Sequence, residues 1–321
     1  MIGVLLINLG TPEAPTEEAV RNYLNVFLSD PYVITLPTFL RNFLVQKIIL
    51  PKRPKASAHA YQQVWTEQGS PLLVNSLALQ QKLSEKLAGK MVVKLGMRYS
   101  KPSIETALLE LHNHACEKII VIPLFPQFAN ATAQSALDVV RDVANRHTIT
   151  TPLDIIVDFH DRDFYIDSLA TQMKNTLSQL DYEFLLLSYH GLPVRQAGSD
   201  LYQAQCYRTS TLLIEKMGLP SENTLTTFQS RLGFAKWIQP YTDKSLAALR
   251  EKGITKLAVA SPSFVADCIE TLEEINIRLR AQWISLGGKS FDYIPCLNAE
   301  MLWVESFAEF LQARMQSVIL L

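Results

Sequence analysis

A histidine and three acids stand out because their types and spacing suit proton transfer or metal binding. His190 follows an apolar run in LLLSYHGLP and precedes a Gly-Leu-Pro turn. Asp267, Glu270 and Glu274 recur at spacings of three and four in SPSFVADCIETLEEI (261–275). On a helix, these spacings put the acids on one face. A neutral imidazole beside carboxylates suits both the transfer of a proton and the binding of a borderline divalent metal.

The same residues also have a purely structural explanation. Asp267 followed three residues later by Glu270 matches a capping box with Asp in place of Ser or Thr, and acids in a first turn interact favourably with the helix dipole. His190 would then be a polar residue that ends a strand. Capping accounts for two of the three acids, but not for their place on the same sheet edge as His190.

The elements that must position these side chains follow from the hydrophobic pattern. Short β-rich runs alternate with longer amphipathic stretches, which predicts parallel sheets with crossover helices. Strands are predicted at 2–8, 91–97, 118–124, 152–157, 183–189, 224–229 and 255–260. Helices are predicted at 16–28, 72–88, 103–115, 132–146, 163–180, 200–217, 242–252 and 267–280.

The two halves of the sequence resemble each other. LLINLGTP near the start is similar to LLLSYHGLP, and KIIVIPLF (118–125) is similar to KLAVASPSF (256–264). A chain of 321 residues also exceeds one typical domain. We therefore predict an α/β protein with two Rossmann-like, doubly wound domains related by a pseudo-repeat. They comprise 1–155 and 156–321, with the terminal helix (301–318) packing back on the first. Because ligands bind beyond the carboxyl ends of parallel strands, His190 is expected at the rim of a cleft between the domains.

Composition argues against several other classes of protein. Thirty basic and 31 acidic residues give a net charge of −1 without a basic block, so nucleic acid is not an expected partner. Four scattered cysteines without a CxxC pair favour reduced thiols in the cytoplasm. The opening MIGVLLINLG lacks the charged start of a signal peptide, and no run of about 18 uncharged apolar residues predicts a membrane span.

GGKS (287–290) lacks the leading glycine of a phosphate loop, since position 283 is Trp283, and we interpret it as a turn.

Longer motifs carry a resemblance to a known family. LLLSYHGLP, TFQSRLGFAKWIQPYTDKSL (227–246) and SPSFVADCIETLEEI, with NLGTPEAP, GSPL (69–72), MRYSKPSIETAL (97–108) and PLFPQF (123–128), resemble ferrochelatase over essentially the whole chain and in the same order. The resemblance implies a chelatase-like pair of Rossmann-like domains with a porphyrin cleft between them. It also implies a lyase that inserts ferrous iron into protoporphyrin IX, releasing two protons, in the terminal step of haem biosynthesis.

The resemblance further implies roles for residues of the second domain. His190 matches the family's catalytic histidine and Glu270 its partner glutamate, and both are expected to contact the metal. Asp267 and Glu274 would continue a relay for protons or metal. Cys268 stands where some relatives carry a histidine, so any role of that histidine does not carry over.

For the first domain, the resemblance implies contacts with the porphyrin. Arg98 and Tyr99 match an Arg-Tyr pair that positions the ring from the opposite wall of the cleft. Leu9 falls where a residue rests against the face of the macrocycle. Arg53 lies in a segment that contacts propionates, in a looser alignment.

The expected partners are protoporphyrin IX and ferrous iron, bound by a monomer without a tightly held cofactor. Relatives with an iron–sulfur cluster often use a cysteine-rich C-terminal extension, whereas this sequence ends at SVILL, so no cluster is expected. The segment 36–54 carries a broad apolar stripe from Phe39 to Ile49 followed by the basic KRPK. A helix packed on its domain explains this stripe as well as a partly exposed lip does, and the resemblance favours the lip, with peripheral contact at the inner face of the cell membrane.

Three alternative functions remain open from the residues. A cobalt or nickel chelatase that acts on another tetrapyrrole would use similar chemistry. A non-catalytic porphyrin carrier would need no relay, so the pair of His190 and Glu270 argues against it. A nucleotide-binding α/β protein is disfavoured because the sequence contains neither GxGxxG nor a complete phosphate loop.

Overall fold

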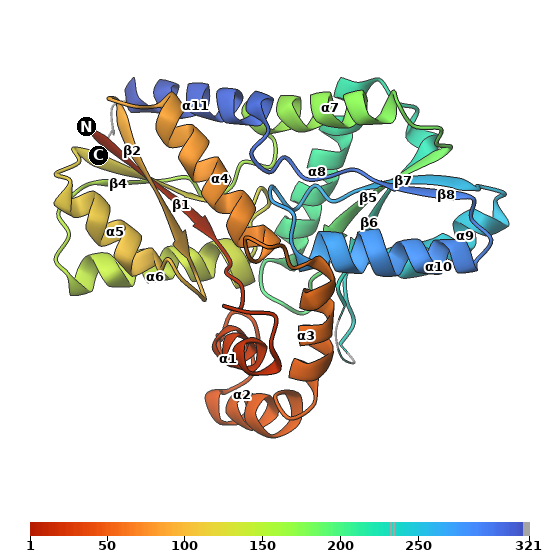
Figure 1. The fold of residues 1–321 in the computed structure, drawn as a ribbon, viewed down its shortest axis with the longest axis horizontal. Coiled ribbons are helices and arrows are strands. Elements are labelled where there is room, and N and C mark those ends of the chain that lie inside the picture. Colours follow the sequence, from red (N-terminus) through yellow and green to blue (C-terminus); the bar gives the residue numbers. More distant parts are fainter. Residues whose placement is uncertain (232, 234, 317–321) are drawn as a thin grey trace. The chain divides into compact units, whose positions relative to one another are not determined.

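The computed structural model describes residues 1–231, 233 and 235–316. Contacts within the chain divide it into two units (Figure 1). Unit 1 comprises Met1–Asp158 and the residues from Phe307 onward, and unit 2 comprises Phe159–Ser306. Leu232 and Phe234 of the 227–246 motif, and the end of the predicted terminal helix, lie outside the described residues.

Unit 1 is built on a four-stranded parallel sheet in the order β2-β1-β3-β4. Its strands are β1 (Ile2–Asn8), β2 (Met91–Met97), β3 (Lys118–Pro123) and β4 (Leu153–Ile155). Its helices are α1 (Glu17–Leu28), α2 (Thr38–Phe43), the π-helix η1 (Leu44–Ile49), α3 (Arg53–Val64), α4 (Pro71–Lys86), α5 (Ile104–Asn113), the π-helix η2 (Asn130–Gln134) and α6 (Ser135–Arg146).

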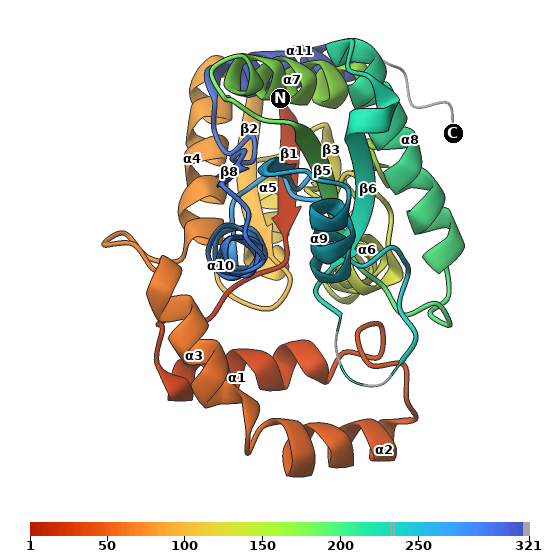
Figure 2. The same cartoon turned by 90° about the vertical axis from the view of Figure 1, so that its right-hand side faces the viewer.

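The central strand of this sheet is buried on both faces. Leu5 and Ile7 of β1 pack in a core with α5 and α6, and they are fully buried. Val4 and Leu6, which are also fully buried, point to the other face because side chains alternate along a strand. This explains why β1 is a continuous apolar run in the sequence. The group of α1, α2 and α3 lies beyond the carboxyl end of β1 (Figure 2).

Unit 2 is likewise built on a four-stranded parallel sheet, in the order β6-β5-β7-β8. Its strands are β5 (Phe184–His190), β6 (Thr224–Gln229), β7 (Lys256–Ala260) and β8 (Ser290–Tyr293). Its helices are α7 (Asp163–Leu177), α8 (Ser199–Met217), the 3₁₀ helix η3 (Ser221–Asn223), α9 (Thr242–Glu251), the π-helix η4 (Glu270–Leu279) and α10 (Arg280–Ser285). A core of Phe184, Leu186, Leu257, Val259 and their neighbours joins this sheet to α9, η4 and α10.

The prediction of two α/β repeats is confirmed by the strand orders. When the strands of each unit are numbered along the chain, both sheets have the order 2-1-3-4. The similar segments LLINLGTP and LLLSYHGLP therefore occupy equivalent first strands, β1 and β5. KIIVIPLF and KLAVASPSF occupy equivalent third strands, β3 and β7.

The GGKS segment is a turn, as predicted, and leads into β8, which the sequence did not predict. Gly287 ends α10 with a φ of +86°, a conformation that favours glycine. A Cβ on Gly288 would lie 2.2 Å from Trp283 Nε1. The same indole nitrogen donates to Ser290 O at 2.7 Å, so the tryptophan fixes the turn.

The terminal helix α11 (Met301–Gln316) is tied to the sheet of unit 1 near its end. Arg314 donates from Nε and Nη2 to the two oxygens of Asp154, at 3.0 and 2.7 Å. Lys118 Nζ donates to Arg314 O at 3.0 Å. Among the helices described, none is long and apolar enough to cross a membrane.

Candidate active site

His190 is the last residue of β5, and its backbone is held from two sides. Its N–H donates to Ser263 Oγ at 3.0 Å, in the loop after β7. Its carbonyl accepts from the Tyr202 hydroxyl of α8 at 2.7 Å. Gly191 turns the chain away, and a Cβ there would lie 2.7 Å from Gln229 O. The sequence LLLSYHG therefore places a histidine at a fixed point on the carboxyl edge of the sheet.

The hydrogen bond of the His190 imidazole decides which ring nitrogen can act as a base. Its Nδ1 lies 2.7 Å from Gly191 O. Because a carbonyl oxygen can only accept, Nδ1 must carry the hydrogen, and in the neutral ring Nε2 then keeps a free lone pair. The side chain is partly exposed, and no hydrogen bond to Nε2 occurs among the residues that the structure describes. Nε2 can therefore accept a proton or bind a metal.

Glu270 and Glu274 lie in the π-helix η4, which packs on the sheet beside His190. Gln229 is the partner of His190 in the β5–β6 register, and its Nε2 donates to Glu270 O at 2.8 Å. Ser230 follows, and its N and Oγ donate to the two carboxylate oxygens of Glu274, at 2.8 and 2.6 Å. The end of β6 thus connects the histidine with both acids. π-Helical turns are rare in proteins, and those that occur are often found at functional sites.

The capping box predicted for this helix is formed by other residues. Cys268 N donates to Thr271 Oγ1 at 3.0 Å, so Thr271 is the residue that reaches back. Cys268 O accepts the first helical bonds from Thr271 N and Leu272 N. The capping contact at the start of the helix therefore does not use the Glu270 carboxylate, which still lies in the first turn, where the helix dipole favours an acid.

Asp267 lies in the same region, but its carboxylate is an acceptor for several donors. It is 5% exposed. Oδ1 accepts from Thr271 Oγ1 at 2.9 Å and Tyr293 OH at 2.6 Å, and Oδ2 accepts from Asn298 Nδ2 at 2.7 Å and Cys296 N at 3.3 Å. These bonds join the loop before η4 to the first turn of η4, to the last residue of β8 and to the segment that follows β8. Asp267 therefore anchors this loop, and the relay role that the sequence suggested stays a prediction.

The four cysteines are all buried as free thiols. Burial, followed by the neighbouring Glu270 carboxylate, holds the pKa of Cys268 well above its usual range. Burial likewise raises the pKa of Cys116, Cys206 and Cys296. Thiols with raised pKa values stay protonated at neutral pH and are poor nucleophiles and metal ligands.

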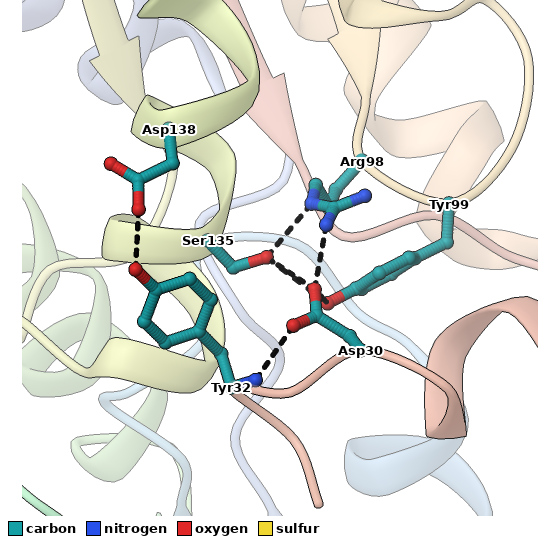
Figure 3. Close-up of polar contacts among 6 residues, drawn as sticks. All are labelled: Asp30, Tyr32, Arg98, Tyr99, Ser135 and Asp138. Atoms are coloured by element: carbon teal, nitrogen blue, oxygen red, sulfur yellow. Dashed lines mark hydrogen bonds and ion pairs between the residues drawn. The ribbon is translucent and has the colours of Figure 1, made fainter. Parts of the chain in front are cut away.

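In unit 1, a second polar cluster surrounds the buried carboxylate of Asp30 (Figure 3). Asp30 Oδ2 accepts from Arg98 Nη2 at 2.6 Å, Tyr99 OH at 2.7 Å and Ser135 Oγ at 2.6 Å. Asp30 Oδ1 accepts from Tyr32 N at 2.7 Å. Arg98 Nε also donates to Ser135 Oγ at 2.8 Å. The cluster fixes both side chains of the Arg-Tyr pair that follows β2.

The residues predicted to contact porphyrin in unit 1 differ in their settings. Burial raises the pKa of Tyr99 well above its usual range, so its hydroxyl stays protonated and donates to Asp30. Arg98 keeps its Nη1 outside these bonds (Figure 3). Leu9 is partly exposed beside the pair, since Tyr99 N donates to Leu9 O at 2.9 Å. Arg53 is the exposed first residue of α3.

Comparison with known proteins decides which family this site belongs to. The model of the family described as Ferrochelatase matches residues 1–315. A protein named Ferrochelatase from Coxiella burnetii (strain Dugway 5J108-111) is 45% identical over 98% of this chain and 94% of its own length. The chain belongs to the ferrochelatase family. Ferrochelatases of Actinobacillus pleuropneumoniae serotype 5b (strain L20) and Legionella pneumophila (strain Paris) are 43% and 44% identical, covering 98% and 95% of this chain and 98% and 96% of their own.

Solved structures support the same fold at much lower identity. SirB from Bacillus subtilis with Fe3+ has a TM-score of 0.58 and 12% identity, covering 98% of each chain. The sirohydrochlorin chelatase SirB from Bacillus subtilis subspecies spizizenii in complex with cobalt also has a TM-score of 0.58, at 10% identity, covering 96% of this chain and 92% of its own. The chain thus shares the repeated chelatase fold.

Several residues around the ferrochelatase motifs were missed by sequence reasoning. Asp30 and Ser135 are 68 and 37 positions from Arg98, and Gln229 is 41 positions from Glu270. A single sequence carries no signal for such pairings. The only local hint is that Gln229 and Ser230 end a predicted strand on the same sheet edge as His190.

We predict that Asp30→Asn destabilises the protein. Either orientation of the amide turns its NH₂ toward a donor, and Arg98 is left without its charged partner. Breaking a buried ion pair in this way costs about 3 kcal/mol or more, which corresponds to a fall in melting temperature of roughly 6–12 °C. The control is Glu17→Gln, which removes the exposed ion pair with Arg21 and should cost at most about 1 kcal/mol. Thermal melts in which both variants shift equally would contradict this account of Asp30.

Proposed function

We propose that the protein inserts Fe²⁺ into protoporphyrin IX to give protohaem, the terminal step of haem biosynthesis. The observation that carries the proposal is the free Nε2 of His190 on the sheet edge that also holds the acids of η4. Membership of the ferrochelatase family supports the same reaction. Two N–H protons leave the macrocycle for each metal that enters.

The proposed mechanism starts from the flat porphyrin. Two inner N–H protons occupy the plane in which the metal must sit, so holding the ring bent exposes nitrogen lone pairs and acidifies the N–H groups. His190 then accepts a proton through Nε2, or briefly binds the iron there. The proton or the iron next passes to Glu270. Glu274, one step along η4, takes the proton or metal onward. Asp267 contributes by anchoring the loop before this helix.

Residues of unit 1 are proposed to contact the porphyrin. Leu9 offers an apolar surface to the face of the macrocycle, and Arg53 offers a guanidinium to a propionate. Arg98 would use Nη1, since Nε and Nη2 are already bound to Ser135 and Asp30. Tyr99 would contribute through its ring, because its hydroxyl is bound to Asp30.

The segment of α2 and η1 is proposed to receive the hydrophobic porphyrin and to contact the membrane surface peripherally, with the protein otherwise cytoplasmic. Phe39, Phe43 and Ile48 are 72%, 59% and 45% exposed, whereas Arg41 of the same segment is 8% exposed. Arg41 donates to Leu36 O at 2.8 Å, so the charge turns inward and the apolar side chains turn outward. Exposed apolar side chains followed by a basic KRPK suit an interface with anionic lipid. Co-sedimentation with anionic vesicles, lost on Phe39→Ser with Phe43→Ser, tests this contact.

We also propose that the purified protein contains no iron–sulfur cluster. Such clusters are held by cysteine thiolates, whereas the four cysteines here are buried, with raised pKa values. The expected result is no visible absorbance from a cluster and no stoichiometric iron or sulfide after anaerobic purification. Iron and sulfide at about two per chain, as in a [2Fe–2S] cluster, would contradict this proposal.

A competition assay tests the proposed substrates against the alternatives. Protoporphyrin IX with Fe²⁺ and a partly reduced tetrapyrrole with Co²⁺ or Ni²⁺ are supplied in parallel, and metallation is followed in the visible spectrum. The proposal expects preference for Fe²⁺ and protoporphyrin. Preference for the other pair indicates a cobalt or nickel chelatase, and tight binding of porphyrin without metallation indicates a carrier.

A further inference from the structure

The residue opposite His190 in the sheet has contacts that the proposed mechanism does not use. Gln229 ends β6 and is 4% exposed. It is the register partner of His190, and its carbonyl accepts from Gly191 N at 2.8 Å. The main chain of Gln229 is therefore fixed directly to the turn that carries the histidine.

The side chain of Gln229 continues this connection to η4. Its Oε1 accepts from Ser188 Oγ at 2.8 Å, and its Nε2 donates to Glu270 O at 2.8 Å. Because the carbonyl of Glu270 can only accept, it requires the NH₂ group on its side, which leaves Oε1 for the Ser188 hydroxyl. Ser188 is fully buried and lies two residues before His190 on the same strand. The Gln229 side-chain amide thus connects β5, the strand that ends at His190, with Glu270, the first residue of η4.

Gln229 and Ser230 hold the two acids in different ways. Ser230 binds the Glu274 carboxylate itself with N and Oγ, and adopts a φ of +64° to do so. Non-glycine residues with positive φ are uncommon and are often found at functional sites. Gln229 instead binds the main chain of Glu270, so it fixes the position of this residue without using its carboxylate.

We propose that Gln229 is a positioning residue that sets the separation between the His190 imidazole and the Glu270 carboxylate. This inference rests on the proposed function, because it concerns the proton transfer between these two groups. A shift of about 1 Å in reacting groups can cost about 100-fold in rate. Loss of the amide should therefore lower kcat by about 10- to 100-fold, with little change in the KM for porphyrin.

The test compares Gln229→Met, Glu270→Gln and the double variant with the wild type, by kcat, KM and thermal melting. Methionine keeps a similar volume but makes neither hydrogen bond. If Gln229 acts through Glu270, the double variant is no slower than Glu270→Gln alone, whereas independent effects multiply. The matched control is Gln80→Met, which removes the hydrogen bond that the Gln80 side-chain amide donates to Val93 O in unit 1 and should leave kcat unchanged.

The outcomes separate this inference from the proposed function. A wild type that inserts no metal contradicts both. An active wild type with an unchanged Gln229→Met variant, or with multiplying effects in the double variant, overturns the positioning role alone. If Gln229→Met does not fold, Ser188→Ala replaces it in the same comparison, because it leaves the Gln229 amide without its second anchor. A Ser188→Ala variant with wild-type kcat would then overturn the inference.

Discussion

His190→Ala is expected to fold and to bind porphyrin, but to lose nearly all metal insertion. The main chain of this residue is held by Ser263 Oγ and the Tyr202 hydroxyl, and alanine keeps both contacts, although it loses the side-chain hydrogen bond from Nδ1 to Gly191 O. What disappears is Nε2, the free lone pair of the site. A positioned base contributes about 10²- to 10⁴-fold to a rate, so turnover should fall by at least about 100-fold.

The measurement is zinc or iron insertion, followed by the visible spectrum, together with porphyrin binding and a thermal melt. His114→Ala is the control, since His114 is exposed at the end of α5. Turnover close to wild type in His190→Ala would remove the histidine from the mechanism. Loss of porphyrin binding together with activity would assign His190 to substrate binding.

Glu270→Gln is expected to have the second large effect, a fall in rate of roughly two to four orders of magnitude. The neutral amide cannot accept a proton from His190. The fold should be unaffected, because Thr271 caps the helix and Gln229 binds only the main chain of Glu270. Porphyrin affinity and melting temperature should therefore change little.

Glu274→Gln provides the comparison within the same helix. Glu274 lies four residues farther along η4 than Glu270. In the variant, Ser230 can still donate to the remaining amide oxygen. Its rate should fall less than that of Glu270→Gln in the same assay. An active Glu270→Gln variant, or one whose loss of activity follows a loss of stability, would show that Glu270 serves only the helix.

Much of the fold could be predicted because parallel strands buried on both faces are continuous apolar runs. IGVLLIN and MVVKLGM match β1 and β2 to the residue, and the predicted strand 183–189 is shifted by one from β5. The strand β8 was missed because SFDY is short and mixed in polarity, and tertiary pairing with β7 makes it a strand. The π-helical geometry of η4 has no signature in the hydrophobic pattern.

The candidate site was predictable where residue type and strand position coincide. His190 at the end of an apolar run is such a case, and the acids of η4 share a face at helical spacing. The roles of the polar partners could not be predicted, because they depend on long-range contacts. Asp267 matched a cap in the sequence, but its neighbours Tyr293 and Asn298 make it an anchor. Thr271, which is not part of the predicted capping pattern, makes the capping contact.

The most direct test of the account is an anaerobic insertion assay with the purified wild-type protein, protoporphyrin IX and Fe²⁺. The spectrum of free porphyrin should convert to that of protohaem at a rate proportional to enzyme concentration, with two protons released for each haem formed. His190→Ala in the same assay should show only the uncatalysed rate. Porphyrin that binds but stays metal-free with the wild type, or haem formed equally fast by His190→Ala, would contradict the claim that this histidine drives metal insertion.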